Sequence, residues 1–313
     1  MVSLPIKKIP VQSVLETSPP QMVCPVCNGQ DLQLYRDDMD TNLISSALGS
    51  SRNDVSHGRI LRCHTCRFGF RQFRPSEESL VVLYCELDSK VYEKESSGRT
   101  KTAKRHLRIV QRYVTQGRLL DVGCASGGFL CVAADAGWQV VGVEPAKVLC
   151  NQAKQALKGR GDVWCCSLQE ASFPPSSFDA ITLWDVLEHV PEPVQFMRQC
   201  SSLLKPGGYL FVNVPDLDSI PARVLGKRWP LLLAEHLNYF NRASLKRCGE
   251  LAKLRWVKFG QRPASFSVEY LFYRLAQHNV VGAAFGHRIF AENFLGQISA
   301  PIFLGESYGV WKR

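Results

Sequence analysis

Apolar strands and helices alternate regularly between residues 118 and 215, and this alternation constrains the fold more than any other feature. Short apolar runs at 118–124, 138–145, 162–167, 178–184 and 209–215 are separated by helical patterns at 129–137, 146–157 and 193–204. Continuous apolar strands that alternate with helices are typical of a parallel sheet covered on both faces. Residues 255–260 and 306–313 add two further strands. The sequence therefore predicts an α/β fold with a Rossmann-like, seven-stranded, mostly parallel sheet and helices on both faces.

The size and composition of the chain allow one large domain and one small one. The chain has 313 residues, of which 45% are hydrophobic and 21% charged, which excludes wholesale disorder or a coiled-coil rod. We expect an N-terminal arm at 1–20, a cysteine-rich domain at 21–75 with a long loop at 37–58, a helical linker at 76–116 and the main domain at 117–313. No apolar run is long enough to span a membrane, and residues 1–12 lack the apolar stretch of a signal peptide. These features predict a cytoplasmic protein.

The net charge of +10 is concentrated in the last third of the chain. Residues 221–313 carry 14 Lys and Arg against 5 Asp and Glu, whereas residues 1–80 carry 9 against 8. Such asymmetry raises the local concentration of anionic partners, which include phosphates, nucleic acid and an acidic membrane surface. A basic, solvated surface without any such partner is the alternative.

Two CxxC pairs predict a structural metal site. Cys24 and Cys27 form the first pair, and Cys63 and Cys66 form the second. Each pair can direct two thiolates at one tetrahedral ion, so together they predict a Cys₄ zinc ribbon, Zn²⁺ being structural. A redox dithiol or simple packing is the alternative. The ribbon is too small to bury much core, so we expect the metal to stabilise it and the ribbon to fold separately from the main domain. The other eight cysteines are assigned to apolar packing.

A glycine-rich turn followed by an acidic residue predicts a cofactor site. Asp121, Gly123 and Gly127 lie where a strand ends and a helix begins, and Glu144 ends the next strand. Glycine allows the backbone to approach a ligand closely, and a carboxylate at the second position can accept hydrogen bonds from ribose hydroxyls. The pattern predicts a nucleoside-containing cofactor, although its spacing differs from the GxGxxG of dinucleotide sites.

The segments LLDVGCASGGFL, VVGVEP, FDAITLWDVLEHVPEP and LLKPGGYLFVNVP resemble those of class I S-adenosylmethionine-dependent methyltransferases over about residues 100–260. The segment EHLNYFNRASL resembles the branch with ubiquinone-type O-methyltransferases and glycan-pathway methyltransferases. The resemblance implies S-adenosyl-L-methionine as cofactor. The resemblance also implies that nine residues border the cofactor, namely Asp121, Gly123, Cys124, Gly127, Glu144, Ser167, Leu168, Trp184 and Asp185.

Two histidines are candidates for the chemistry. His236 lies in the insertion after the fifth strand, where substrates approach in this family, and a neutral imidazole suits a general base. His189 lies just beyond Asp185, also near the predicted site. A purely structural role is open for both, and Glu235 is a weaker candidate base.

The acceptor remains open between two classes of partner. The first is a small molecule, such as a sugar, a lipid-linked glycan or a related metabolite, whose phosphate could contact Arg223, Lys227 and Arg228. The second is RNA, held by the ribbon and the basic last third. The nearly neutral charge of residues 1–80 argues against RNA. Peripheral contact with a membrane is compatible with the same basic residues. A binding module without enzymatic activity is a third reading, which the intact glycine-rich turn argues against.

Overall fold

The computed structural model describes residues 22–37, 58–72, 96–233, 235–269, 272, 283–290, 296 and 298–313. The N-terminal arm, the 37–58 loop apart from its two end residues and most of the first half of the 76–116 linker lie outside the described residues. The described part of the linker contains one long helix, α3 (Ser96–Gln111), which buries Leu107 and Val110.

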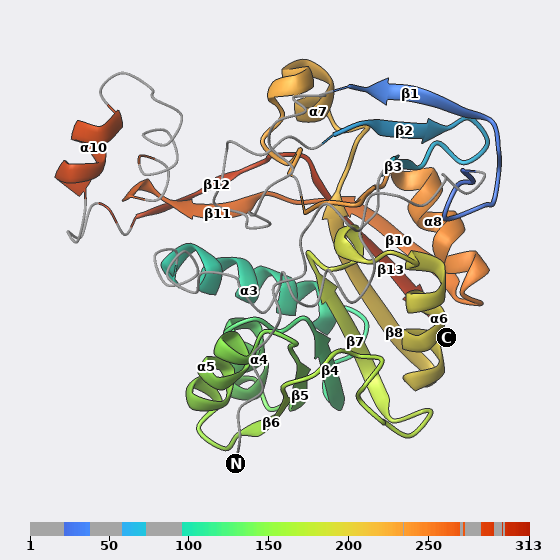
Figure 1. The fold of residues 1–313 in the computed structure, drawn as a ribbon. Helices are drawn as coiled ribbons and strands as arrows, with labels where there is room; N and C mark the ends of the chain where they lie inside the picture. Colours follow the sequence, from blue (N-terminus) through green and yellow to red (C-terminus); the bar gives the residue numbers. More distant parts are fainter. Residues whose placement is uncertain are drawn as a thin grey trace, which may run out of the picture.

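The predicted sheet is present, with seven strands in the order β10-β13-β8-β7-β4-β5-β6 (Figure 1). Five strands run parallel and form its centre and one edge: β4 (Arg118–Val122), β5 (Gln139–Val143), β6 (Gly161–Trp164), β7 (Phe178–Trp184) and β8 (Leu204–Pro215). Two antiparallel strands complete the other edge, namely β13 (Glu306–Lys312) and β10 (Arg255–Gln261). The first of these strands along the chain, β4, therefore lies inside the sheet. Strands β5 and β6 extend the sheet from β4 to one edge, and β7 pairs with the other side of β4.

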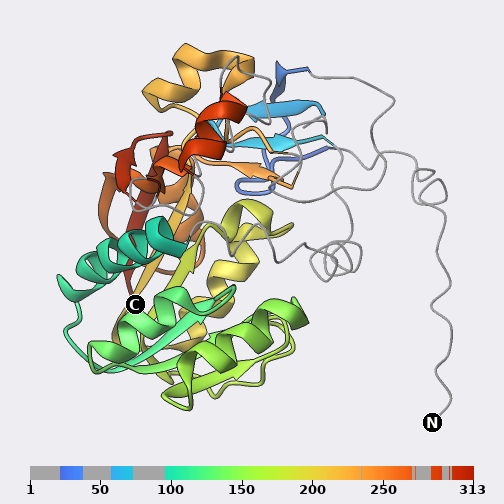
Figure 2. The same ribbon diagram turned by 90° about the vertical axis from the view of Figure 1, so that its left-hand side faces the viewer.

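Helices cover both faces of this sheet, as predicted (Figures 1 and 2). One face packs against α3, α4 (Gly128–Asp135) and α5 (Lys147–Leu157), with Leu119 and Val140 pointing into that core. The other face packs against α6 (Pro193–Leu203) and α8 (Arg242–Leu251), with Leu120 and Val141 pointing into it. Successive strand residues enter opposite cores because side chains alternate along a strand.

The start of β8 differs from the prediction. Residues 205–208 separate the predicted helix at 193–204 from the predicted strand at 209–215, but the strand already begins at Leu204. The pairing with β7 shifts between Phe178 and Ala180, so the extra residues form a bulge in β8. Gly207 takes a positive φ of 84° there, which glycine tolerates.

The cysteine-rich segment forms a small antiparallel sheet, and this sheet is joined to the main domain. It contains β1 (Leu32–Arg36), β2 (Ile60–Cys63) and β3 (Gly69–Arg71). Its fourth strand, β9 (Asn238–Tyr239), comes from the main domain and pairs with β3. Phe68 and Phe70 also belong to the core that α6 and α8 cover. The two parts therefore share one core and one sheet, and the ribbon lacks the separate core that its expected independent folding assumed.

The described residues between β10 and β13 include two strands that pair antiparallel, β11 (Ala264–Ser267) and β12 (Ser299–Ile302), and the helix α10 (Ala283–Phe290). This two-stranded sheet packs against α3. After β8, two short helical segments, α7 (Ile220–Leu225) and η3 (Gly226–Arg228), lie beside β1 and β2 (Figure 1). None of the described helices is long and apolar enough to cross a membrane.

Candidate functional site

The glycine-rich turn lies at the carboxyl end of β4 and has the geometry that its sequence predicts. Gly123 and Gly127 have positive φ angles of 71° and 81°. A Cβ on Gly123 would lie 2.8 Å from Val186 Cγ2, and one on Gly127 would lie 3.0 Å from the Cα of Ala153. Both positions therefore exclude a larger residue. Helix α4 begins directly after Gly127, so its first N–H groups are available to polar atoms of a ligand.

Glu144 holds this turn from the next strand. Its Oε2 accepts a hydrogen bond from the Ala125 amide, and its Oε1 accepts one from the Ala146 amide, each at 2.9 Å. The side chain is buried, and burial raises the pKa of its carboxyl. Each carboxylate oxygen can accept more than one hydrogen bond. Glu144 can therefore support the turn and still accept from the vicinal hydroxyls of a ribose.

Asp121 lies beneath the turn and is buried. Its Oδ1 accepts a hydrogen bond of 2.6 Å from the Thr182 hydroxyl on β7. Burial raises the pKa of Asp121 to about 7, although the Thr182 bond acts in the opposite direction. Cys124 is buried beside the turn, and burial raises the pKa of its thiol.

Ser167 and Leu168 follow β6, at the same edge of the sheet. The Ser167 amide and hydroxyl both donate to Glu170 Oε2, at 2.7 and 2.8 Å. Leu168 is buried, and its carbonyl accepts from Gln199 Nε2 at 2.9 Å. The loop is thus held in place next to the carboxyl ends of β5 and β6, where the resemblance predicts adenine contacts.

Trp184 ends β7 and is packed between two aromatic rings. His106 from α3 stacks on it, with ring centroids 3.7 Å apart and an interplanar angle of 4°, and Phe129 contacts it edge-on at 5.5 Å. Sequence reasoning missed His106. It lies within a helical pattern where a buried histidine has the same spacing as an apolar residue, so the sequence carries no signal for it.

Asp185 belongs to a polar network that sequence reasoning also missed. Asn213 on β8 donates to the Asp185 carboxylate, and Arg262 donates to Asn213 Oδ1 at 3.2 Å. Arg262 also pairs with Glu306 at 3.4 Å. Burial and the nearby charge of Asp185 raise the pKa of Glu306 to about 7. Asp185 itself has a φ of 57°, in the left-handed region that few non-glycine residues adopt. Its side chain is exposed at the carboxyl end of β7.

His189 and His236, the two candidate catalytic residues, lie together, with ring centroids 4.9 Å apart and an interplanar angle of 73°. His189 belongs to the short 3-10 helix η2 (Leu187–His189). Its Nδ1 is 3.0 Å from the Glu235 carbonyl oxygen, and His236 Nδ1 is 2.9 Å from the Leu231 carbonyl oxygen. A carbonyl only accepts, so Nδ1 is the protonated nitrogen of each ring.

The same place in the fold holds a buried acid. Glu188 is 1% exposed, and its Oε2 has no hydrogen-bond partner among the described residues. Burial raises the pKa of Glu188, lowers that of His189 to about 4, and lowers that of His236 well below its usual value. Both imidazoles are therefore neutral near pH 7. Sequence reasoning missed Glu188 because a single glutamate at a helix start has no distinguishing pattern.

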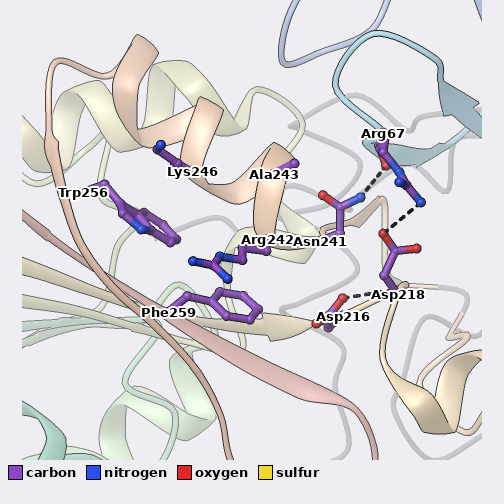
Figure 3. A pocket seen from close by; sticks show the side chains of 9 residues that line it. All are labelled: Arg67, Asp216, Asp218, Asn241, Arg242, Ala243, Lys246, Trp256 and Phe259. Atoms are coloured by element: carbon purple, nitrogen blue, oxygen red, sulfur yellow. Dashed lines mark hydrogen bonds and ion pairs between the residues drawn. The ribbon is translucent and has the colours of Figure 1, made fainter.

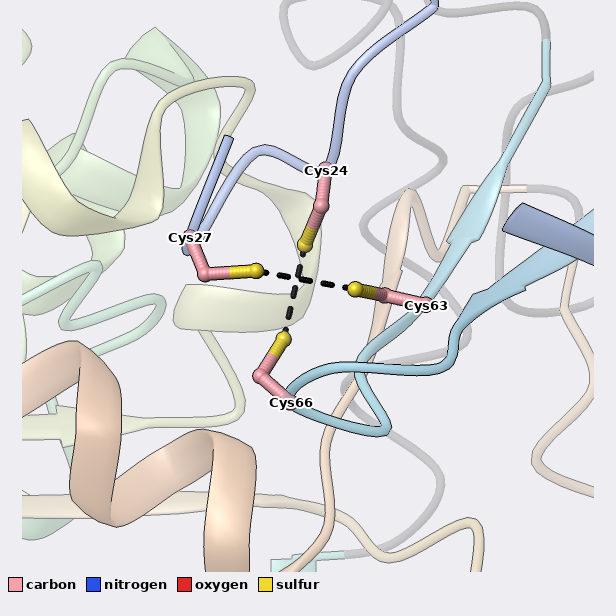
Figure 4. Close-up of side chains that lie close together, drawn as sticks. All are labelled: Cys24, Cys27, Cys63 and Cys66. Atoms are coloured by element: carbon pink, nitrogen blue, oxygen red, sulfur yellow. Dashed lines mark hydrogen bonds between the residues drawn. The ribbon is translucent and has the colours of Figure 1, made fainter. Parts of the chain in front are cut away.

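The four paired cysteines converge as predicted (Figure 4). Cys24 Sγ is 3.5 Å from Cys66 Sγ, and Cys27 Sγ is 3.5 Å from Cys63 Sγ. Tetrahedral zinc with Zn–S bonds of about 2.3 Å separates its sulfur atoms by about 3.8 Å, so the cluster fits that ion closely.

The two turns that carry these cysteines are built alike. The residue after the second cysteine, Asn28 or Arg67, has φ near 60° and donates from its amide to the carbonyl of the first cysteine at 2.9 Å. A Cβ on Gly29 would lie 3.3 Å from Cys27 Sγ. The polar and glycine residues after each pair therefore permit the tight turns.

One pair of cysteines contradicts the sequence interpretation. Cys150 on α5 and Cys165 after β6 form a disulfide, whereas both were assigned to packing as free thiols. Cys150 is buried, and a buried half-cystine has the same helical spacing as an apolar residue. The pair therefore could not be recognised from its sequence spacing.

A separate groove of about 480 Å³ lies between the ribbon and the antiparallel edge of the sheet (Figure 3). Arg67 of the ribbon forms one side of it and pairs with Asp218 at 3.5 Å, while Asn241 Nδ2 donates to the Arg67 carbonyl at 2.9 Å. Arg242 lies over the Phe259 ring on the other side. None of the predicted cofactor or catalytic residues lines this groove.

The fold and the glycine-rich turn define the class of protein. The turn, Glu144 and the loop after β6 meet at the carboxyl ends of parallel strands, where such sheets bind nucleoside cofactors. A family model described as "Methyltransferase domain" matches residues 95–258, and the chain belongs to this family. It is an S-adenosylmethionine-dependent methyltransferase.

Curated relatives resemble only part of this chain. The ubiquinone biosynthesis O-methyltransferase of Chromobacterium violaceum is 33% identical over 145 residues, which are 44% of this chain and 62% of the relative. Its counterpart from Xanthomonas campestris is 40% identical over 109 residues, or 34% of this chain and 45% of the relative. The matched regions thus span about half the length of these relatives.

Solved structures resemble the fold. One is a SAM-dependent methyltransferase from Methanosarcina mazei, at 17% identity and a TM-score of 0.47, covering 66% of this chain and 96% of that one. Another is a SAM-dependent methyltransferase from Archaeoglobus fulgidus, at 19% identity and a TM-score of 0.48, covering 69% and 94%.

Proposed function

We propose that this enzyme transfers the methyl group of S-adenosylmethionine to a small-molecule acceptor, a sugar, lipid-linked glycan or related metabolite. The observation that carries the proposal is the position of Asp185, His189 and His236. Asp185 and His189 follow β7 at its carboxyl end, and His236 lies beside His189. Val186, next to Asp185, lies against Gly123 of the glycine-rich turn, where a Cβ would be 2.8 Å from its Cγ2. The relatives, named as O-methyltransferases of ubiquinone biosynthesis, support a small acceptor.

The cofactor supplies an activated methyl group on its sulfonium, so the protein mainly has to position the acceptor. Asp121, Gly123, Cys124 and Gly127 would border the methionine part, and Glu144 the ribose. Ser167 and Leu168 would contact the adenine, and Trp184 and Asp185 would lie beside the reacting methyl group. His236, with His189 beside it, would take part on the acceptor side, where Nε2 of each neutral ring can accept a proton or a hydrogen bond.

The electrostatics of the ribbon favour a small acceptor over RNA. Arg59 pairs with Asp37 at 3.3 Å, and Arg62 pairs with Asp218 at 2.7 Å. Arg71 is half-buried. These three arginines are therefore paired or partly buried within the protein, whereas a nucleic-acid surface needs an exposed basic face.

Exposed cations lie on α7 and η3 instead. Arg223, Lys227 and Arg228 are all exposed there, and we assign them to a phosphate of the acceptor. Alanine at all three positions should raise the KM for a phosphorylated acceptor and leave the affinity for S-adenosylmethionine unchanged. An equal loss of activity toward phosphorylated and unphosphorylated acceptors would contradict this assignment.

A transfer experiment tests the proposed acceptor class. Protein is incubated with methyl-labelled S-adenosylmethionine and cell extract separated into lipid, nucleotide-sugar and RNA fractions. Label should enter the lipid or nucleotide-sugar fraction. Label confined to RNA, together with binding that weakens steeply as salt rises, would overturn the small-molecule proposal in favour of the RNA alternative.

A further inference from the structure

We propose that the disulfide between Cys150 and Cys165 is a thiol–disulfide exchange site, and that an external thiol that opens it weakens the binding of the cofactor. The bond joins helix α5 to the segment that follows β6, across a sequence separation of 15 residues. The exchange itself is independent of the proposed function. Its effect on the cofactor rests on that function, because it needs the residues that we assign to the ribose and the adenine.

The disulfide lies between the two segments that carry these residues. On one side is Glu144, whose Oε1 accepts a hydrogen bond of 2.9 Å from the amide of Ala146, the N-cap residue of α5. On the other side, Cys165 comes two residues before Ser167, where the loop assigned to the adenine begins. The bond therefore links the ribose side of the cofactor site covalently to its adenine side.

The hydrogen bonds of the loop after β6 hold it in other directions. The Ser167 amide and hydroxyl donate to Glu170 within the loop, at 2.7 and 2.8 Å. The Leu168 carbonyl accepts from Gln199 of α6 at 2.9 Å. These bonds fix the shape of the loop and its position against α6. Opening the disulfide would therefore allow the loop to move relative to α5 while these bonds remain.

Solvent reaches the disulfide through Cys165. This residue is half-buried and lines an open cleft of about 570 Å³, together with Lys154 and residues 162–164 and 166. Cys150, in contrast, is fully buried. A thiolate that enters the cleft would thus meet the sulfur of Cys165, and the sulfur of Cys150 would be the leaving group.

The neighbouring Cys166 does not replace an external thiol. It is a free, half-buried thiol. Burial raises its pKa, so near pH 7 the sulfur stays protonated, and only the thiolate form is an effective nucleophile. The exchange therefore needs a thiol from outside the chain. A small thiol such as the tripeptide glutathione suits an open cleft.

Two external thiols complete the reaction. The thiolate of the first forms a bond to the sulfur of Cys165, the bond to Cys150 breaks, and its electron pair stays on the Cys150 sulfur, which takes up a proton. The second thiolate attacks the outer sulfur of this mixed disulfide, and the Cys165 sulfur leaves with its electron pair and is protonated. The protein disulfide is reduced to two thiols, and the two external thiols are oxidised to their own disulfide.

Opening the disulfide should weaken the binding of S-adenosylmethionine, because the loop after β6 must then be ordered as the cofactor binds. Coupling between two sites is reciprocal, so bound S-adenosylmethionine should make the disulfide harder to reduce by the same factor. Typical couplings predict a factor of about 5 or more.

Glutathione buffers test the exchange. The full chain is equilibrated with mixtures of reduced and oxidised glutathione, free thiols are alkylated, and the peptides of Cys150 and Cys165 are quantified by mass spectrometry. The two cysteines should be reduced together, with the mixed disulfide on Cys165 at intermediate mixtures. A disulfide that resists reduced glutathione in large excess would overturn the exchange, and a mixed disulfide on Cys150 would overturn the assigned point of attack.

The same titration with saturating S-adenosylmethionine tests the coupling. The squared concentration of reduced glutathione, divided by that of oxidised glutathione, should be about 5-fold or more higher at half-reduction than without cofactor. Calorimetry should give the same factor between the affinities of the oxidised and the reduced protein for S-adenosylmethionine, and reoxidation should restore the higher affinity. Equal affinities in the two states would overturn the coupling.

Variants separate this disulfide from the other cysteines. Cys165→Ser cannot form the bond and should bind S-adenosylmethionine as reduced wild type does, with no response to glutathione. Cys131→Ser removes a half-buried free thiol of α4 and should behave as wild type in both states. A redox response that persists in Cys165→Ser would overturn the assignment to this pair. Failure of wild type to bind S-adenosylmethionine in either state would instead overturn the proposed function, while the titration without cofactor would still decide the exchange.

Discussion

Glu144 has two tasks, and both depend on its carboxylate. It accepts from the amides of Ala125 and Ala146, and we assign it the hydroxyls of the cofactor ribose. A single residue thus couples the shape of the glycine-rich turn to recognition of the ligand. Its position at the end of β5 made it predictable, because the carboxyl ends of adjacent parallel strands meet at one edge.

Glu144→Ala should weaken the binding of S-adenosylmethionine by about 2–3 kcal/mol, since charge-assisted hydrogen bonds are lost. Isothermal titration calorimetry measures this directly. Asp135→Ala is the control, because Asp135 is an exposed carboxylate at the end of α4 that pairs with Arg160 on the surface. Unchanged affinity in Glu144→Ala would remove Glu144 from the cofactor site.

Asp121 should make stability depend on pH. Burial raises its pKa to about 7, against an ordinary value of 3.8. Well below pH 3.8 the carboxyl is protonated in both the folded and the unfolded state. As the pH rises to 7, only the unfolded state releases the proton, so folding stability falls. Asp121→Asn cannot ionise and should be more stable than wild type at pH 8, by on the order of a few kcal/mol, and this gain should be much smaller at pH 4.5.

Urea unfolding at the two pH values, without cofactor, measures the difference. Asp179 provides a control of opposite sign. Burial acts to raise its pKa, but the hydrogen bonds from Lys205 and the Arg118 amide lower it overall. Asp179→Asn should therefore be less stable than wild type at pH 8 and at pH 4.5 alike, because both values lie above the ordinary pKa of 3.8, and the deficit should shrink only at lower pH. Equal effects of Asp121→Asn at both pH values would show that Asp121 is not buried as described.

The elements of the main sheet could be predicted, whereas the elements that join it to the ribbon could not. Strands such as β5 and β7 are continuous apolar runs, and their burial on two faces makes them visible in the sequence. Strand β9 has two residues, and no periodic pattern can show so short a strand. His236, two residues before it, could be named as a candidate, but the position of the ribbon beside it could not.

Long-range polar contacts were equally invisible. Arg262 reaches Asn213 and Glu306, and Glu188 lies beside His236, only because distant segments pack together. Their burial depends on tertiary structure, and a single charged residue in a sequence is more often a solvated one. The cofactor turn was predictable because its residues are local, while the acceptor side is assembled from several separate segments.

The junction of β3 and β9 gives a testable constraint. A Cβ on Gly69 would lie 2.8 Å from Leu217 Cδ2 and 3.2 Å from Tyr239 Cβ. Gly69→Val should therefore force β3 away from β9 and destabilise the protein by about 1–3 kcal/mol, as overpacking does. Methyl transfer should fall as well, because His236 precedes β9. Leu34→Val on β1 alters an exposed side chain of the same small sheet and is the control. Wild-type stability in Gly69→Val would exclude close packing at this junction.

The ribbon and the catalytic domain should unfold as one unit. Cys24, Cys63 and Phe68 lie in the same apolar core as Leu120 and Ile181 of the central strands. Asn241, which caps α8, also donates to the Arg67 carbonyl of the ribbon. We assign zinc to the four cysteines. Because that core is shared, the free energy with which the ion stabilises the ribbon would stabilise the catalytic domain too.

Cys63→Ser should release this zinc and lower the Tm of the entire chain. Loss of several kcal/mol corresponds to a decrease on the order of 10 °C for a domain of this size. Differential scanning calorimetry should show one transition in both proteins, and hydrogen exchange at Asn238 and Tyr239 should speed up in the variant because β9 loses its partner strand. His64→Ser, which changes an exposed residue of the same turn and no cysteine, should match wild type. Two transitions, with the upper one unmoved by Cys63→Ser, would show that the ribbon folds on its own and that the shared core contributes little.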